Sequence, residues 1–115
     1  MKKIFNKLVR DKLIDIYEQD LKEGKILDYK TRILAQDEMR SLLLDKLTEE
    51  VGEVREEYNN PEKLKEEIAD VLEVIEAMMH QHGFSQEEII QIKEKKKSQR
   101  GGFEKGVYLE TIDFN

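Results

Sequence analysis

The segment between Lys46 and Ile75 constrains the fold more strongly than any other part of this chain. It contains two helix-forming runs separated by Asn59, Asn60 and Pro61. Asn60 is a favourable N-cap residue, and Pro61 suits the first helical position, where a missing N–H carries no penalty. The segment therefore predicts a helical hairpin with a tight turn.

Four acidic residues are placed symmetrically about this turn. Glu50 and Glu53 lie ten and seven residues before Asn60. Glu67 and Asp70 lie seven and ten residues after it. At about 1.5 Å of rise per residue, both pairs are roughly 10–15 Å from the turn, and the i, i+3 spacing puts the acids of each helix on one face. The hairpin is therefore expected to bring four carboxylates together.

Apolar stripes predict which helix faces are buried. The first stripe contains Leu43, Leu47, Val51, Val54 and Tyr58, and the second contains Leu64, Ile68, Val71, Leu72, Val74, Ile75, Met78 and Met79. Glu67 falls within the second stripe, where a carboxylate must be paired or must bind a metal. Solvated acid pairs are also common in a chain with 40% charged residues, so either pair alone would be weak support. The mirrored arrangement favours a site for Mg²⁺, with Mn²⁺ as a substitute, because all the ligands are oxygens. Its predicted metal ligands are Glu50, Glu53, Glu67 and Asp70.

Helix start and stop signals occur along the rest of the chain. They predict helices from about Asp11 to Glu23, from Gln36 to Tyr58 with Asp37 as a cap, from Pro61 to Gln81, and from Ser85 to Ser98. The segment 25–34 is expected to be a loop or a short extended piece. We therefore predict an all-α fold, an antiparallel helical hairpin core in a four-helix, bundle-like domain. The single domain, 1–115, divides into an N-terminal arm and helix (1–35), the metal-binding hairpin (36–82), and a C-terminal helix, Gly-Gly loop and tail (85–115).

Composition limits the partners that such a domain can have. Only 38% of the 115 residues are hydrophobic, so thinly supplied stripes are expected to complete their burial between subunits of a homo-oligomer, a dimer or tetramer. The net charge of −6 argues against a nucleic-acid partner. No cysteine is present for a disulfide or a thiolate metal site, and no apolar run approaches the ~20 residues of a membrane span. A cytoplasmic protein without a membrane partner is the expectation.

Three motifs of this sequence resemble a known family. Glu49-Glu50-x-x-Glu53 followed by Glu67-x-x-Asp70 resembles the EExxE…ExxD signature of the MazG-like, all-α nucleoside triphosphate pyrophosphohydrolases. The segments 6–12 (NKLVRDK) and 100–110 (RGGFEKGVYLE) are similar to a small single-domain bacterial and phage subgroup. The relatives carry an I-P pair after the first segment, whereas Leu13 and Ile14 continue here without proline.

The resemblance implies Mg²⁺-dependent hydrolysis of a (deoxy)nucleoside triphosphate to the monophosphate and pyrophosphate, a reaction suited to cleaning the nucleotide pool. The metal would bind the triphosphate oxygens, offset their charge and lower the pKa of a bound water. Glu50 belongs to the implied catalytic residues as well as to the metal ligands. By the family pattern Glu49 orients or deprotonates the water or contacts the metal through water; otherwise it is a surface acid.

Five basic residues are candidates for contact with the nucleotide phosphates: Arg10, Lys12, Lys46, Lys97 and Arg100. Charge alone favours an ordinary basic N-terminus, and the resemblance makes Arg10 and Lys12 phosphate contacts. Lys46 is equally suited to an i, i+4 ion pair with Glu50. Lys97 also fits a simple helix-dipole role, whereas Arg100, before two glycines, offers a bidentate fork for phosphate.

Two other functions are compatible with this pattern. The first is a diphosphohydrolase that acts on another nucleotide, such as phosphoribosyl-ATP. The second is a non-enzymatic helical binding or regulatory protein that retains the fold. A substrate panel separates the first from the main interpretation, and the second predicts that no Mg²⁺ binds.

Overall fold

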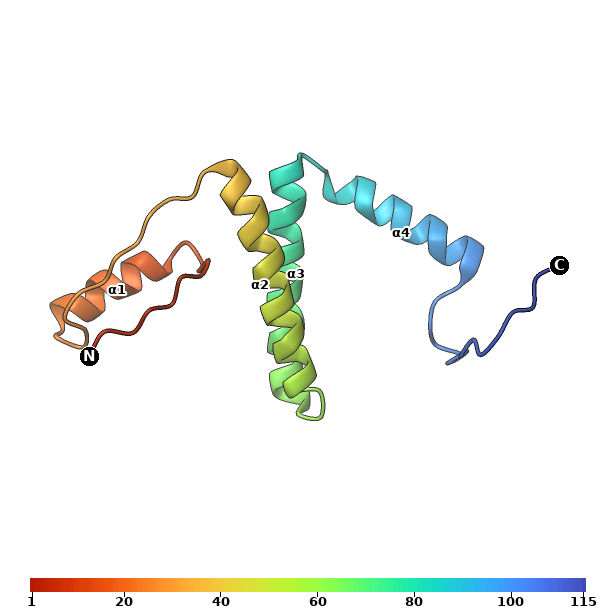
Figure 1. The fold of residues 1–115 in the computed structure, drawn as a ribbon, viewed down its shortest axis with the longest axis horizontal. Coiled ribbons are helices and arrows are strands. Elements are labelled where there is room, and N and C mark those ends of the chain that lie inside the picture. The colour runs from red at the N-terminus through yellow and green to blue at the C-terminus, as the bar shows by residue number, and fades with distance from the viewer.

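Four helices and no strand make up the computed structural model, which describes residues 1–115 (Figure 1). In chain order they are α1 (Leu13–Lys22), α2 (Gln36–Glu56), α3 (Pro61–His82) and α4 (Gln86–Arg100). The all-α prediction is confirmed, and α2 and α3 pack side by side as the predicted antiparallel hairpin.

The turn between α2 and α3 forms for the reasons that its sequence indicates. The Asn60 side chain accepts a hydrogen bond from the backbone N–H of Lys63 at 3.4 Å, and Pro61 occupies the first helical position. At the other end of the hairpin, the Arg40 guanidinium donates to the carbonyl of Gln81 at 3.3 Å. α3 stops at Gly83, whose φ of 71° is in the left-handed region that favours glycine. Polar contacts thus hold both ends of the hairpin, a local one at the turn and a long-range one at the open end.

The flanking helices are also defined locally. The hydroxyl of Tyr29, in the irregular segment after α1, donates to Glu18, and the Tyr29 ring lies 5.6 Å from that of Tyr17. Segment 25–34 is therefore a loop held against α1, without extended pairing. α4 opens with the predicted capping box: Glu88 N–H donates to the Ser85 hydroxyl at 3.1 Å, and Ser85 N–H donates to the Glu88 carboxylate at 3.0 Å.

Four details of the predicted helices are wrong. α1 begins at Leu13, two residues after the predicted Asp11. Asp37 does not cap α2 but lies in its first turn, because the helix already begins after Ala35, whose N–H donates to the Glu38 carboxylate at 3.4 Å. α2 ends at Glu56, two residues before Tyr58, since the chain must leave the helix to make the turn. α4 continues past Ser98, because nothing interrupts it before Gly101.

α1 and α4 extend away from opposite sides of the hairpin, and α2 with α3 is the only extensive helix–helix contact (Figure 1). The radius of gyration is 19.5 Å, whereas a compact chain of this length has one of about 13 Å. Only Leu43 on α2 and Val74 on α3 are buried. A four-helix bundle is therefore not closed within one chain, and its completion by oligomerisation stays a prediction. None of the four helices has both the length and the apolar character that crossing a membrane requires.

Candidate metal centre

Three carboxylates meet where α2 and α3 face each other. One oxygen each from Glu50, Glu67 and Asp70 lies within 4.8 Å of the others. We call these three residues the acid cluster. The Glu50 side chain is only 12% exposed, which is less than the exposed fraction of the Asp70 side chain. The hairpin thus brings acids from both sides of the turn together, as their symmetric spacing predicts.

Glu53 lies close to the acid cluster but outside its group of three oxygens. The pKa of Glu67 is raised above its ordinary value by partial burial and by the charges of Asp70, Glu53 and Glu50. Glu53 thus contributes negative charge to the site, and its predicted role as a direct metal ligand stays a prediction.

Lys46 lies at the edge of the acid cluster, one turn before Glu50. Its ammonium is 3.4 Å from Glu50 and 3.3 Å from Glu49, and its side chain is 18% exposed. Lys46 therefore forms the i, i+4 ion pair with Glu50 and a second ion pair with Glu49. Its contact with phosphate stays a prediction.

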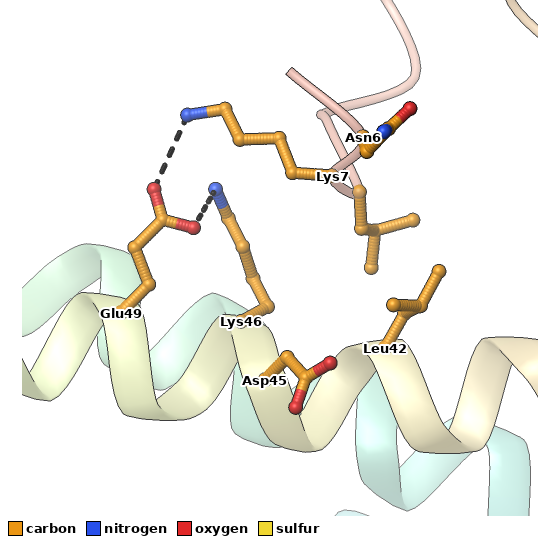
Figure 2. A pocket seen from close by; sticks show the side chains of 7 residues that line it. Asn6, Lys7, Leu42, Asp45, Lys46 and Glu49 are labelled. Carbon is orange, nitrogen blue, oxygen red and sulfur yellow. Dashed lines mark hydrogen bonds and ion pairs between the residues drawn. The ribbon is translucent and has the colours of Figure 1, made fainter. Parts of the chain in front are cut away.

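Glu49 is held between two lysines that come from distant parts of the chain. Lys46 reaches it from α2, and Lys7 reaches it from the N-terminal segment with an Nζ–Oε1 distance of 3.2 Å (Figure 2). Partial burial acts to raise the pKa of Glu49, but the two lysines outweigh it and lower the pKa on balance. Glu49 is therefore ionised at neutral pH and is suited to accept hydrogen bonds.

The N-terminal arm, residues 1–12, reaches acids of the hairpin through Lys7 and Arg10. Arg10 Nη2 is 2.6 Å from Asp70 Oδ1, across sixty positions of sequence. Between this arm and α2 is a half-open hollow lined by Asn6, Lys7, Leu8, Leu42, Asp45, Lys46 and Glu49 (Figure 2). Arg10, predicted to contact phosphate, therefore lies at the acid cluster.

The remaining predicted phosphate contacts are not brought to the acid cluster within this chain. Lys12 is exposed at the N-terminal end of α1 and forms no ion pair. Lys97 and Arg100 are exposed on the last turn of α4, which extends away from the hairpin (Figure 1). Their roles as phosphate contacts stay predictions that require a movement of α4 or a second chain.

Lys7 is the one residue of the site that the sequence patterns did not single out. It lies in the same basic segment as Arg10, and the signal that could have found it is the acid that precedes the E-x-x-E spacing. Glu49 stands beside other carboxylates, so a further positive charge next to it is favourable, and Lys7 supplies that charge in addition to Lys46.

The donor set of the acid cluster fits a hard divalent cation. Its three members offer only carboxylate oxygens, which are the ligands that Mg²⁺ and Mn²⁺ prefer, and they converge from two rigid helices. Carboxylates this close repel one another unless a cation lies between them. The residues present therefore fit a metal ion.

Comparison with known proteins is consistent with this geometry. The family model described as the MazG nucleotide pyrophosphohydrolase domain matches residues 38–101. The comparisons with curated proteins and with solved structures find no match. The matched segment contains α3, α4 and all of α2 except its first two residues, with the complete acid cluster, and it leaves out the N-terminal arm. Because the match covers more than half of the chain, the protein belongs to the MazG nucleotide pyrophosphohydrolase domain family.

Proposed function

We propose that this protein hydrolyses a (deoxy)nucleoside triphosphate to the nucleoside monophosphate and pyrophosphate with Mg²⁺ as its cofactor, and that its task is to clean the nucleotide pool. Family membership implies a nucleotide pyrophosphohydrolase, and the family is metal-dependent. The observation that carries the proposal is the convergence of Glu50, Glu67 and Asp70 from two helices to within 4.8 Å. In an acidic protein, a metal at these carboxylates is the most direct way to hold a triphosphate.

The acid cluster would hold the cofactor, with Glu53 as a further ligand from α2. Mg²⁺ there would offset the charge of the triphosphate and activate a water. Each acid alone is a weak indicator, since exposed carboxylates are common in proteins without metals. Support comes from their joint geometry and from the raised pKa of Glu67, to which partial burial and the charges of the neighbouring acids both contribute.

Basic residues around the acid cluster would bind and orient the nucleotide. The Arg10 guanidinium offers a planar fork that fits a phosphate, and Lys46 offers a compact charge at the edge of α2. Glu49 would accept a hydrogen bond from the attacking water and fix its direction, since its carboxylate is ionised. Lys12 would add charge next to Arg10.

The chain would work as a homo-oligomer. Six apolar residues of the hairpin are exposed by 37–68% and repeat at helical spacing: Leu44 and Val51 on α2, Tyr58 in the turn that follows α2, and Ile68, Leu72 and Ile75 on α3. We call them the outer apolar stripe. At 100° per residue they lie roughly 80–160° around each helix from the acids, so a partner could cover them without blocking the metal centre. A second chain could also bring Lys97 and Arg100 to the nucleotide.

Pyrophosphate release is the direct test of this function. The purified chain would be assayed with Mg²⁺ on a panel of ribo- and deoxynucleoside triphosphates, together with phosphoribosyl-ATP. Asp70→Asn should abolish release, and Glu76→Gln, an exposed acid elsewhere on α3, should not. Orthophosphate as the product would mean that a different bond is cleaved. Turnover of phosphoribosyl-ATP alone, or binding without turnover, would support one of the two other functions instead.

A further inference from the structure

The N-terminal arm places a cation on one member of the acid cluster. Arg10 Nη2 lies 2.6 Å from Asp70 Oδ1, and the Asp70 side chain belongs to the three-oxygen group that fits a metal. The arm lies outside the segment that the family model matches. The family model therefore does not describe this contact.

A metal ion and Arg10 have conflicting demands on Asp70. The Arg10 guanidinium donates a hydrogen bond to Asp70 Oδ1 and so occupies an oxygen that a metal would bind. Its positive charge also repels a second cation nearby. The Arg10 side chain is 59% exposed and residues 1–12 contain no helix, so a departure of this side chain from Asp70 would disrupt neither a core nor a helix. Exposed ion pairs of this type shift an equilibrium by about fivefold or less, so a divalent ion can displace Arg10.

We propose that Arg10 is an exchangeable counter-ion of the metal centre. Arg10 neutralises Asp70 while no metal is bound, leaves Asp70 when a divalent cation binds, and then pairs with a phosphate oxygen of the nucleotide. The proposal rests on the proposed function, because it takes the acid cluster as the metal site. Lys7 and Glu49 keep the arm beside the hairpin during this exchange, since their ion pair involves no member of the acid cluster.

This exchange has opposite consequences for the two ligands. Removal of the Arg10 side chain deletes a competitor of the metal, so metal affinity should rise. The same change deletes a partner of the phosphate, so nucleotide affinity should fall. If Arg10 merely positioned the acids, its removal would lower both the metal affinity and the nucleotide affinity. If its role were purely structural, its removal would not change the two affinities in opposite directions.

Metal affinity is measured first, by titration calorimetry with Mn²⁺ alone on metal-stripped full-length protein. Arg10→Ala should bind Mn²⁺ about two- to fivefold more tightly than the wild type. Lys2→Ala is the matched control, because it removes the same charge from the same arm at a residue without an ion pair, and it should stay within about twofold. Equal or weaker binding by Arg10→Ala would overturn the proposal. A wild type that binds no Mn²⁺ would refute the proposed function itself.

Nucleotide affinity is then measured at saturating Mn²⁺ with a triphosphate analogue whose α–β bridge is a methylene. Arg10→Ala should bind this analogue about tenfold more weakly than the wild type, and Arg10→Lys should recover part of the loss. Unchanged analogue binding would overturn the transfer of Arg10 to phosphate even if metal binding had tightened. Circular dichroism of each variant checks that the four helices are retained.

Discussion

A carboxylate oxygen of Glu50 on α2 lies within 4.8 Å of one from Asp70 on α3, although the two residues stand on opposite sides of the hairpin turn. Glu67 completes the group, and Glu53 stays outside it. This geometry predicts that Glu50, Glu67 and Asp70 bind the metal more directly than Glu53 does, and variants of these residues can test this order.

Variants of Glu50 and Asp70 should be more damaging than a variant of Glu53. Glu50→Gln and Asp70→Asn each remove a direct ligand and should lower Mn²⁺ affinity and pyrophosphate release by more than about 100-fold. Glu53→Gln removes a neighbouring charge and should lower them by about 10–100-fold, as outer partners of metal sites do. Calorimetry and a pyrophosphate assay on the three variants would measure this order. An equal or larger loss in Glu53→Gln would make Glu53 a direct ligand.

Glu67 should destabilise the metal-free protein at neutral pH. Its pKa is raised in the folded state by partial burial and neighbouring acids, so folding favours its protonated form. Protonated Glu67 therefore contributes to the free energy of unfolding below the ordinary pKa of 4.5, and this contribution is lost as the pH rises through the raised pKa. Glu67→Gln should accordingly unfold at a higher temperature than the wild type at pH 7 in a chelator, with the difference disappearing below pH 4.5.

Saturating Mn²⁺ should reverse this ranking, because only the wild type retains the complete acid cluster and gains stability from the bound ion. Thermal melts of both proteins with and without Mn²⁺ would record the change. A lower melting temperature for Glu67→Gln in the chelator would contradict the prediction.

Gly52 should be replaceable by alanine without a steric conflict in one chain. A Cβ added at this position meets no atom within 4 Å, and the residue lies in the middle of α2. Gly52→Ala should therefore raise the free energy of unfolding by about 0.5–1 kcal/mol, measured by urea denaturation. Ala69→Gly, at an exposed interior position of α3, is the reciprocal control and should lower it by a similar amount. Loss of stability in Gly52→Ala would instead indicate that a partner chain approaches this face.

The outer apolar stripe should determine the oligomeric state. Leu72, at its centre on α3, is 55% exposed in the single chain. Leu72→Glu would place a charge in a buried subunit interface and should shift the protein to a smaller species in light scattering after size-exclusion chromatography. Leu27→Glu is the control, because Leu27 is 91% exposed in the loop after α1 and should leave the mass unchanged. A wild-type monomer would refute the proposed oligomer.

Much of the hairpin could be predicted because its determinants are local. Asn60 and Pro61 define the turn, and the mirrored spacing of the acids follows from the constant rise of an α-helix. Capping residues likewise located the start of α4, where Ser85 and Glu88 exchange hydrogen bonds. The predicted cap at Asp37 was wrong because α2 begins after Ala35, which has no polar side chain to signal a helix start, and Glu38 binds the Ala35 N–H instead.

The N-terminal arm could not be placed in the same way. Its basic residues are compatible with solvent, phosphate or protein acids, since charge alone does not select a partner. Lys7 reaches Glu49 and Arg10 reaches Asp70 across more than forty positions of sequence, and such contacts depend on how the chain returns to the hairpin. The resemblance directed attention to Arg10 but did not indicate that it would pair with a metal ligand.

The sequence by itself determined the four helices, the turn, and the faces that carry acids and apolar residues, because helix periodicity and capping act over a few residues. Only the tertiary structure decided that Glu50, Glu67 and Asp70 form the close group while Glu53 stays beside it, since angstrom differences in helix packing separate the four acids. The tertiary structure also decided that α1 and α4 leave the hairpin, so that its outer apolar stripe stays exposed in one chain. Long-range packing has no local signal along the chain, and it positions the charges on which the proposed chemistry depends.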